Sequence, residues 1–130
     1  MLDHVEIYVS NLKKSRSFYD FLLSHLGWKL YQEWEYGFSY RFDSHYLVFV
    51  QTDSKYITNI FHRKNTGLNH LAFQLNTIIE IDQLRSVLLE YGVNELYANR
   101  YPNAGGEDCY AFYFEDPDRI KLEIVLRKGS

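Results

Sequence analysis

Two stretches of the chain share one alternating pattern of apolar and polar residues. Residues 2–9 read LDHVEIYV and residues 68–75 read LNHLAFQL. Apolar side chains recur at every second position in both, which is typical of a β-strand with one buried face. The stretches match at a constant offset of 66 residue numbers, so that His4 corresponds to His70. The pattern predicts two related strands, one in each half of the chain.

A helical pattern follows each of these strands. Residues 10–27 and residues 77–92 both carry apolar side chains at near-helical spacing along one side. Polar residues that favour helix starts precede each pattern, and a glycine that favours a helix end closes it. The expected caps are Ser10 or Asn11 with Gly27 in the first half, and Thr77 with Gly92 in the second.

Three short strand-like segments follow each predicted helix. They lie near 28–35, 37–43 and 45–52 in the first half, and near 93–98, 110–115 and 119–126 in the second. Each half therefore reads β-α-β-β-β, which predicts an α+β fold. A half of about 55 residues would leave one face of its sheet exposed, so we expect the halves to pair as an open curved sheet around a cleft. The chain is expected to be a single domain over 1–130, with a first module at 1–52, a linker at 53–66 and a second module at 67–127.

The alternation also predicts which side chains turn away from the helices and toward the cleft. His4 and His70 lie between the apolar positions of their strands, and Glu123 lies between those of the last strand. In the strand at 45–52 the purely aliphatic set is assigned to the helix side, which leaves Phe49 and Gln51 facing the cleft. Phe49 is then a candidate contact for a bound small molecule.

Two imidazoles and a carboxylate on one surface suit a divalent metal such as zinc, nickel, iron, manganese or cobalt. A Gln carbonyl oxygen can complete the set, so the predicted ligands are His4, His70, Glu123 and Gln51. Such a set leaves coordination positions open for chemistry. The structural alternatives are surface or hydrogen-bonded histidines, an ion pair for Glu123 and an ordinary exposed Gln51.

The segment 99–110, NRYPNAGGEDCY, is a candidate mobile rim over the cleft. Its paired glycines permit backbone movement. Arg100, Tyr101 and Tyr110 would there meet a polar or aromatic substrate. A plain loop between two strands explains the same segment equally well.

Composition narrows the class of partner. The net charge is -3 and the isoelectric point is near 5.9, which argues against nucleic acid or an anionic membrane. Cys109 is the sole cysteine, so no internal disulfide or cysteine-based zinc site is possible. No apolar run approaches the roughly 20 residues that span a bilayer, and no secretory signal opens the chain. We expect a cytoplasmic protein that binds a small molecule.

The residues above resemble the vicinal oxygen chelate superfamily, which includes glyoxalase I, bleomycin-resistance proteins, extradiol dioxygenases and fosfomycin-resistance enzymes. The matching stretches are LDHVEIYVSNLKKSRSFYDFLLSHLGWKL at 2–30, LNHLAF at 68–73 and AFYFEDPDRIKLEIV at 111–125. The resemblance implies paired βαβββ modules around a metal, often in a homodimer. By position it implies His4, His70 and Glu123 as ligands. Glyoxalase-like members carry a Glu where this chain offers Gln51, a departure from the glyoxalase I pattern.

Three functions fit the sequence. The first is a metal-dependent lyase or isomerase of the glyoxalase type, in which Glu123 leaves the metal transiently and moves a proton. The second is an extradiol-type dioxygenase with His4, His70 and Glu123 as an iron triad. The third is a metal-free protein that sequesters an aromatic compound among the many tyrosines, as bleomycin-resistance proteins do.

Overall fold

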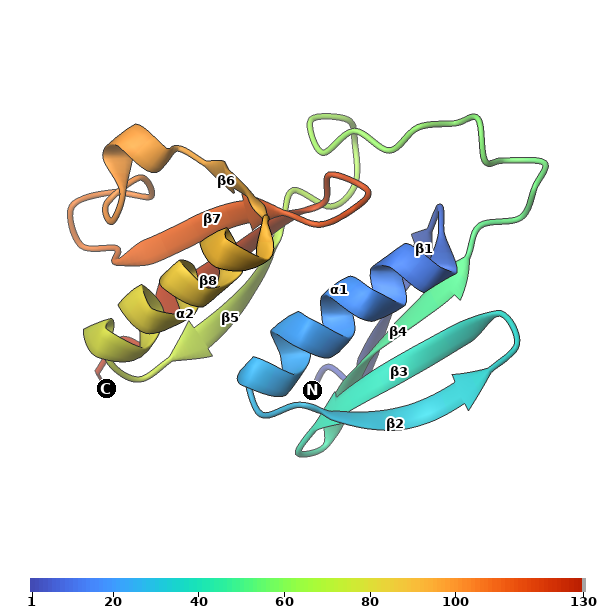
Figure 1. Ribbon diagram of the computed structural model, residues 1–130, viewed down its shortest axis with the longest axis horizontal. Coiled ribbons are helices and arrows are strands. Elements are labelled where there is room, and N and C mark those ends of the chain that lie inside the picture. Colours follow the sequence, from blue (N-terminus) through green and yellow to red (C-terminus); the bar gives the residue numbers. More distant parts are fainter. Residues whose placement is uncertain (130) are drawn as a thin grey trace. The chain divides into compact units, whose positions relative to one another are not determined.

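The computed structural model describes residues 1–129 and has an α+β fold made of two βαβββ modules (Figure 1). The chain divides into two compact units, Met1–Ile60 and the part that begins at Phe61, and each is described by itself. The first unit contains β1 (His4–Val9), α1 (Leu12–His25), β2 (Lys29–Trp34), β3 (Gly37–Phe42) and β4 (His45–Gln51). The second contains β5 (Leu71–Leu75), α2 (Ile78–Tyr91), β6 (Asn94–Leu96), the 3-10 turn η1 (Ala98–Arg100), β7 (Ala111–Glu115) and β8 (Lys121–Leu126).

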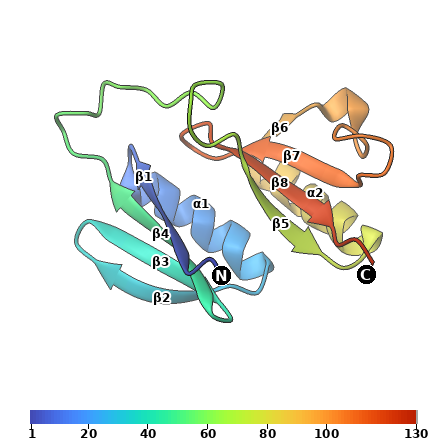
Figure 2. The ribbon, with the colours of Figure 1, turned by 180° about the vertical axis from the view of Figure 1, so that it is seen from behind.

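Both units build the same mixed, open sheet of four strands. The strand order is β1-β4-β3-β2 in the first unit and β5-β8-β7-β6 in the second. The first strand pairs parallel with the last strand of its unit, and the remaining pairs are antiparallel. In Figure 2 the parallel pairs β1–β4 and β5–β8 can be followed in each unit. The repeated order confirms the predicted β-α-β-β-β plan of both halves.

The helices begin and end at the predicted signals. Asn11, rather than Ser10, caps α1 by accepting a hydrogen bond from the Lys14 amide at 3.1 Å. Thr77 caps α2 by accepting one from the Glu80 amide at 3.2 Å. Gly92 ends α2 with a φ of 110°, a left-handed conformation that glycine adopts without a steric penalty.

The helix-covered face of the first sheet is aromatic. The Phe49 side chain is fully buried between the rings of Tyr19 from α1, at 4.0 Å between centroids, and Phe38, at 5.1 Å. Phe49 therefore faces the helix, and the prediction that it faces the opposite side of the sheet is wrong. The reason is that both faces of β4 are apolar, so the aliphatic set did not identify the helix side.

The second sheet buries its helix-facing side in the same way. Phe112 and Phe114 are fully buried, with ring centroids 4.8 Å apart, and Leu122 and Ile124 of β8 are buried with them. Leu88 of α2 is fully buried too. Alternate residues of β8 therefore point away from α2, and Glu123 is one of these.

Neither helix of the described residues combines the length and the apolar character that a membrane crossing requires.

Candidate metal and substrate site

The second unit brings His70 and Glu123 together. The His70 Nε2 atom lies 2.9 Å from the Glu123 Oε1 atom. The Glu123 side chain is 8% exposed and that of His70 is 32% exposed. A carboxylate this deeply buried is costly unless a hydrogen-bonding or charged partner compensates it, so the imidazole contact is what the fold supplies for Glu123.

Strand register explains why these side chains meet. β5 and β8 pair in parallel with Ala72 opposite Glu123, and β7 pairs with β8 so that Tyr113 is opposite Glu123. His70 directly precedes β5 and lies on the same side as Ala72, two residues further on. The alternating pattern of the sequence is therefore sufficient to place His70 and Glu123 on one face.

The first unit holds a matching histidine in a different setting. His4 Nδ1 lies 2.7 Å from the Asp3 Oδ2 atom, and the His4 ring stacks on Tyr46 with centroids 4.6 Å apart. In the second unit the preceding residue does the same, since His70 Nδ1 lies 2.6 Å from Asn69 Oδ1. Both imidazoles are thus oriented through Nδ1 by a side-chain oxygen of the residue before them.

This arrangement has the donor chemistry of a divalent metal site. Metal-binding histidines in proteins usually give one ring N–H to an oxygen, which leaves the other nitrogen for the metal. The 2.9 Å between His70 Nε2 and Glu123 Oε1 is a hydrogen bond, and it brings one nitrogen and one oxygen donor of the kinds that bind zinc to the same place. Over residues 1–129 no group of three His, Cys, Asp or Glu side chains close enough to hold a metal occurs. The described geometry therefore supplies two candidate ligands in the second unit and one in the first.

Gln51, the fourth predicted ligand, lies on the helix side of β4. Its Oε1 accepts a hydrogen bond from the Leu12 amide at 2.9 Å, and its Nε2 donates to the Ser10 carbonyl at 2.8 Å. Both ends of the amide therefore bind the backbone where α1 begins. The register counterpart of Glu123 in the first unit is Val48, because Glu6 pairs with Val48 as Ala72 pairs with Glu123.

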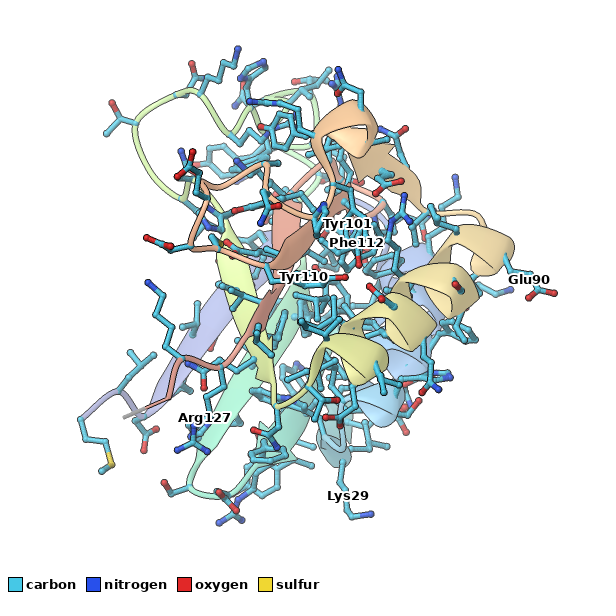
Figure 3. All side chains as sticks on the ribbon, turned by 90° about the vertical axis from the view of Figure 1, so that its left-hand side faces the viewer. Lys29, Glu90, Tyr101, Tyr110, Phe112 and Arg127 are labelled. Carbon is cyan, nitrogen blue, oxygen red and sulfur yellow. The ribbon has the colours of Figure 1, made fainter. Side chains whose placement is uncertain are left out.

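Tyr101 and Tyr110, two predicted substrate contacts, both donate hydrogen bonds from their hydroxyls to Asp82 of α2. Their ring centroids are 5.9 Å apart, and Figure 3 labels both tyrosines with the buried Phe112. These bonds, that from Tyr101 first, hold the pKa of Asp82 below its ordinary value. Burial, followed by the bond to Asp82, raises the pKa of Tyr101. The two hydroxyls thus contact α2.

Arg100, the remaining predicted substrate contact, lies in η1 with its guanidinium carbon 4.9 Å from the centroid of the Tyr97 ring. Tyr97 was not singled out by the sequence analysis, nor was Tyr113. The Tyr97 and Tyr113 rings meet edge to face at 5.5 Å, and the Lys121 ammonium lies 5.0 and 5.1 Å from their centroids. Alternation along β8 does place Lys121 on the same face as Glu123, so the position of Lys121 could be predicted from the sequence.

The segment 99–110 reaches this face of the sheet at two points. Cys109 Sγ lies 4.0 Å from Glu123 Oε2. A Cβ atom added at Gly105 would come within 2.5 Å of the Tyr113 hydroxyl, so a larger residue there would require the Tyr113 side chain to shift. Burial, followed by the nearby Glu123 charge, raises the pKa of Tyr113. The expectation that the segment is a mobile rim stays a prediction, and its ends are held by Tyr101 and Tyr110.

Comparison with known proteins shows the family of this chain. The family model described as Glyoxalase/Bleomycin resistance protein/Dioxygenase superfamily matches residues 1–124. Protein YqjT of Bacillus subtilis (strain 168), named as uncharacterized, is 44% identical over 124 residues, which is 95% of this chain and 97% of that protein.

Solved structures point to the same family. A crystal structure of a Bacillus halodurans protein, provisionally named a glyoxalase, is 50% identical with a TM-score of 0.96, covering 98% of this chain and 96% of that one. The fosfomycin resistance protein FosX of Listeria monocytogenes shares the fold, with a TM-score of 0.69 at 18% identity over 100% of this chain and 93% of its own. This chain therefore belongs to the Glyoxalase/Bleomycin resistance protein/Dioxygenase superfamily.

Proposed function

We propose that this chain is a divalent-metal-dependent lyase or isomerase of the glyoxalase type, acting on a small substrate through two adjacent oxygens. The proposed ligands are His4, His70 and Glu123. The observation that carries the proposal is the buried Glu123 carboxylate 2.9 Å from an imidazole whose other nitrogen is already oriented. His4, with its own Nδ1 partner, repeats that arrangement in the first module.

Residues of this chain would have separate roles in proton transfer and in the orientation of the ligands. A bound metal ion supplies positive charge for the oxygens of the substrate as they become negative. Glu123, once detached from the cation and so basic again, would take a proton from a substrate carbon while the electron pair of that bond moves onto the adjacent substrate oxygen. It would then return the proton to the neighbouring carbon. Tyr113 and Cys109 lie beside Glu123, whose side chain is buried. Asn69 and Asp3 keep the imidazole rings in one orientation.

An extradiol-type dioxygenase with an iron triad is the second candidate. The observation in its favour is Val48, which occupies the first-module counterpart of Glu123 and offers no ligand atom. Two histidines and one carboxylate are the ligand set typical of non-haem iron oxygenases. A homodimer belongs to the same proposal on the family resemblance, and sedimentation velocity tests it. A cytoplasmic location belongs to it on the composition of the chain.

Cobalt(II) titration tests the ligand set, since the visible spectrum of this ion reports its nitrogen and oxygen ligands. We expect the wild type to bind one equivalent, and Glu123→Gln or His70→Ala to weaken binding by about 100-fold. Glu90→Gln is the matched control, because Glu90 is an exposed carboxylate at the far end of α2 (Figure 3). Equal affinity of wild type and Glu123→Gln would contradict the proposal.

The native metal then separates the candidate functions. Zinc or nickel in protein purified without added metal favours the lyase or isomerase, whereas iron with oxygen uptake on a catechol favours the dioxygenase. Protein that binds no metal at any concentration tested, yet binds aromatic compounds, would support the metal-free binder instead.

A further inference from the structure

We propose that Lys121 and Arg100, which both lie against the Tyr97 ring, form a binding site for an oxyanion on the open face of the second sheet. The substrate of the proposed enzyme then carries a carboxylate or a phosphate-type group in addition to the two oxygens that meet the metal. This inference rests on the proposed function for the role of the site, while the anion site itself is tested without metal.

Lys121 is a half-buried cation that no described carboxylate neutralises. Its ammonium donates a hydrogen bond to the Tyr97 hydroxyl at 3.2 Å and otherwise lies against the faces of the Tyr97 and Tyr113 rings. An ammonium has three N–H donors, so two remain for a ligand. Aromatic rings attract a cation but do not cancel its charge.

The carboxylate best placed to neutralise Lys121 has other partners. Glu115 stands directly opposite Lys121 in the β7–β8 pair. Its carboxylate accepts hydrogen bonds from Arg63 at 2.6 Å, from Asn94 at 2.6 Å and from Arg119 at 3.2 Å. With Glu115 held by two arginines, the ammonium is left facing the open side of the sheet.

Arg100 adds a second positive charge at the same ring. Its guanidinium lies 4.9 Å from the Tyr97 centroid, and the side chain makes no ion pair with a carboxylate of residues 1–129. Tyr97 itself has a φ of 59°, a conformation that few non-glycine residues adopt, and its ring contacts both cations. Two cations at one ring without a counterion within ion-pair distance favour the binding of an anion close to that ring.

The anion site lies within reach of the candidate metal ligands. Lys121 and Glu123 are two residues apart on the same face of β8, which is roughly 7 Å along a strand. Tyr113 joins the two places, since its ring contacts Lys121 and has its centroid 6.2 Å from that of His70. One small molecule can therefore span both, with its anionic group at Lys121.

The test uses full-length protein stripped of metal with a chelator, and inorganic phosphate as the probe. Two-dimensional NMR should show saturable shifts at Tyr97 and Lys121, and Lys121→Met should weaken phosphate binding by about ten-fold or more. Lys29→Met is the matched control, because Lys29 also opens a strand but lies exposed in the first unit. Methylphosphonate and acetate, titrated in parallel, distinguish a phosphate-type group from a carboxylate by their relative affinities.

Phosphate binding that is equal in wild type and Lys121→Met, or no saturable shift up to about 100 mM phosphate, would overturn the anion site. Cobalt(II) affinity separates this result from the proposed function, since Lys121→Met should retain it while Glu123→Gln loses it. A loss of phosphate binding in Lys29→Met equal to that in Lys121→Met would also refute the inference, because it would indicate nonspecific attraction to lysines.

Discussion

In the first module His4 stacks on the ring of Tyr46, which is its partner across the parallel strand pair. In the second module the β5–β8 register, extended by one residue before Leu71, makes Lys121 the counterpart of Tyr46. Glu123, two residues further along the same face, stands where the first module has Val48. The open face of the first sheet thus presents an aromatic ring and an aliphatic residue at the two places where that of the second presents two charges.

The helix-covered faces show the opposite relation. Phe49 and Ile124 occupy equivalent positions, paired with Ile7 and Phe73, and both are fully or almost fully buried. Folding requires an apolar face under each helix, so both modules keep one. The open face carries no such requirement, and there the two modules differ in charge and chemistry. Of the three proposed ligands, the second module therefore holds His70 and Glu123 and the first holds His4.

The largest loss of stability should come from truncating a side chain of the apolar face under each helix, the feature that both modules share. Phe49→Ala and Ile124→Ala should each lower the free energy of unfolding by about 3–4 kcal/mol, because each leaves a cavity in a packed core. Urea unfolding followed by circular dichroism measures this. Tyr8→Ala, at a side chain that is 70% exposed, is the control and should change stability little. A stable Phe49→Ala variant that fails only in ligand binding would restore Phe49 as a substrate contact.

A smaller loss of unfolding free energy should distinguish the open face of the second sheet from that of the first. Glu115 and Arg41 are equivalent by register, since they pair with Lys121 and Tyr46. Glu115→Gln should destabilise by about 2–3 kcal/mol at pH 7, because it removes a buried charge from Arg63. Arg41→Gln should cost less than about 1 kcal/mol, since its guanidinium is exposed and lies over one ring.

The stability that the Glu115 carboxylate contributes should decrease as the pH falls. Burial alone would raise the pKa of Glu115, but hydrogen bonds from Asn94, Arg63 and Arg119 lower it below 4.5. The stabilisation is therefore complete above pH 4.5 and is lost as the pH falls through the lower, folded-state pKa. Unfolding at pH 7 and about pH 3 should show the gap between wild type and Glu115→Gln closing in acid. A gap that widens in acid would contradict the assigned ion pair.

Where a strand has one polar face, the alternation of apolar and polar residues was sufficient to predict which side chains turn away from the helix. It placed His70 and Glu123 on the side away from α2, and the structure has them 2.9 Å apart. The repeated order of elements and the caps at Thr77 and Gly92 were also readable, because each depends on local chemistry. No local pattern could reveal the contacts of Tyr97. They depend on the early end of β6 at Leu96 and on the left-handed backbone conformation of Tyr97 itself.

Alternation could not identify the helix-facing side of β4, HYLVFVQ, because this strand is apolar on both faces. The aliphatic Val48 and Val50 gave no sign that the aromatic Phe49 belonged under the helix. Only pairing with β1 settles the face, and it moves Gln51 with Phe49 to the helix side. A single misassigned strand therefore changed one candidate ligand and one candidate substrate contact.

The smallest effect tests that reassignment of Gln51. The second module carries Leu126 at the equivalent position, paired with Leu75 as Gln51 is paired with Val9. Gln51→Leu should destabilise by about 1 kcal/mol, because the Leu12 amide at the start of α1 loses its acceptor, and should leave cobalt(II) affinity unchanged. Gln74→Leu, at an exposed position of β5, is the control. If Gln51→Leu instead weakened cobalt binding about ten-fold without loss of stability, Gln51 would be a ligand and the two modules would be more alike than their registers indicate.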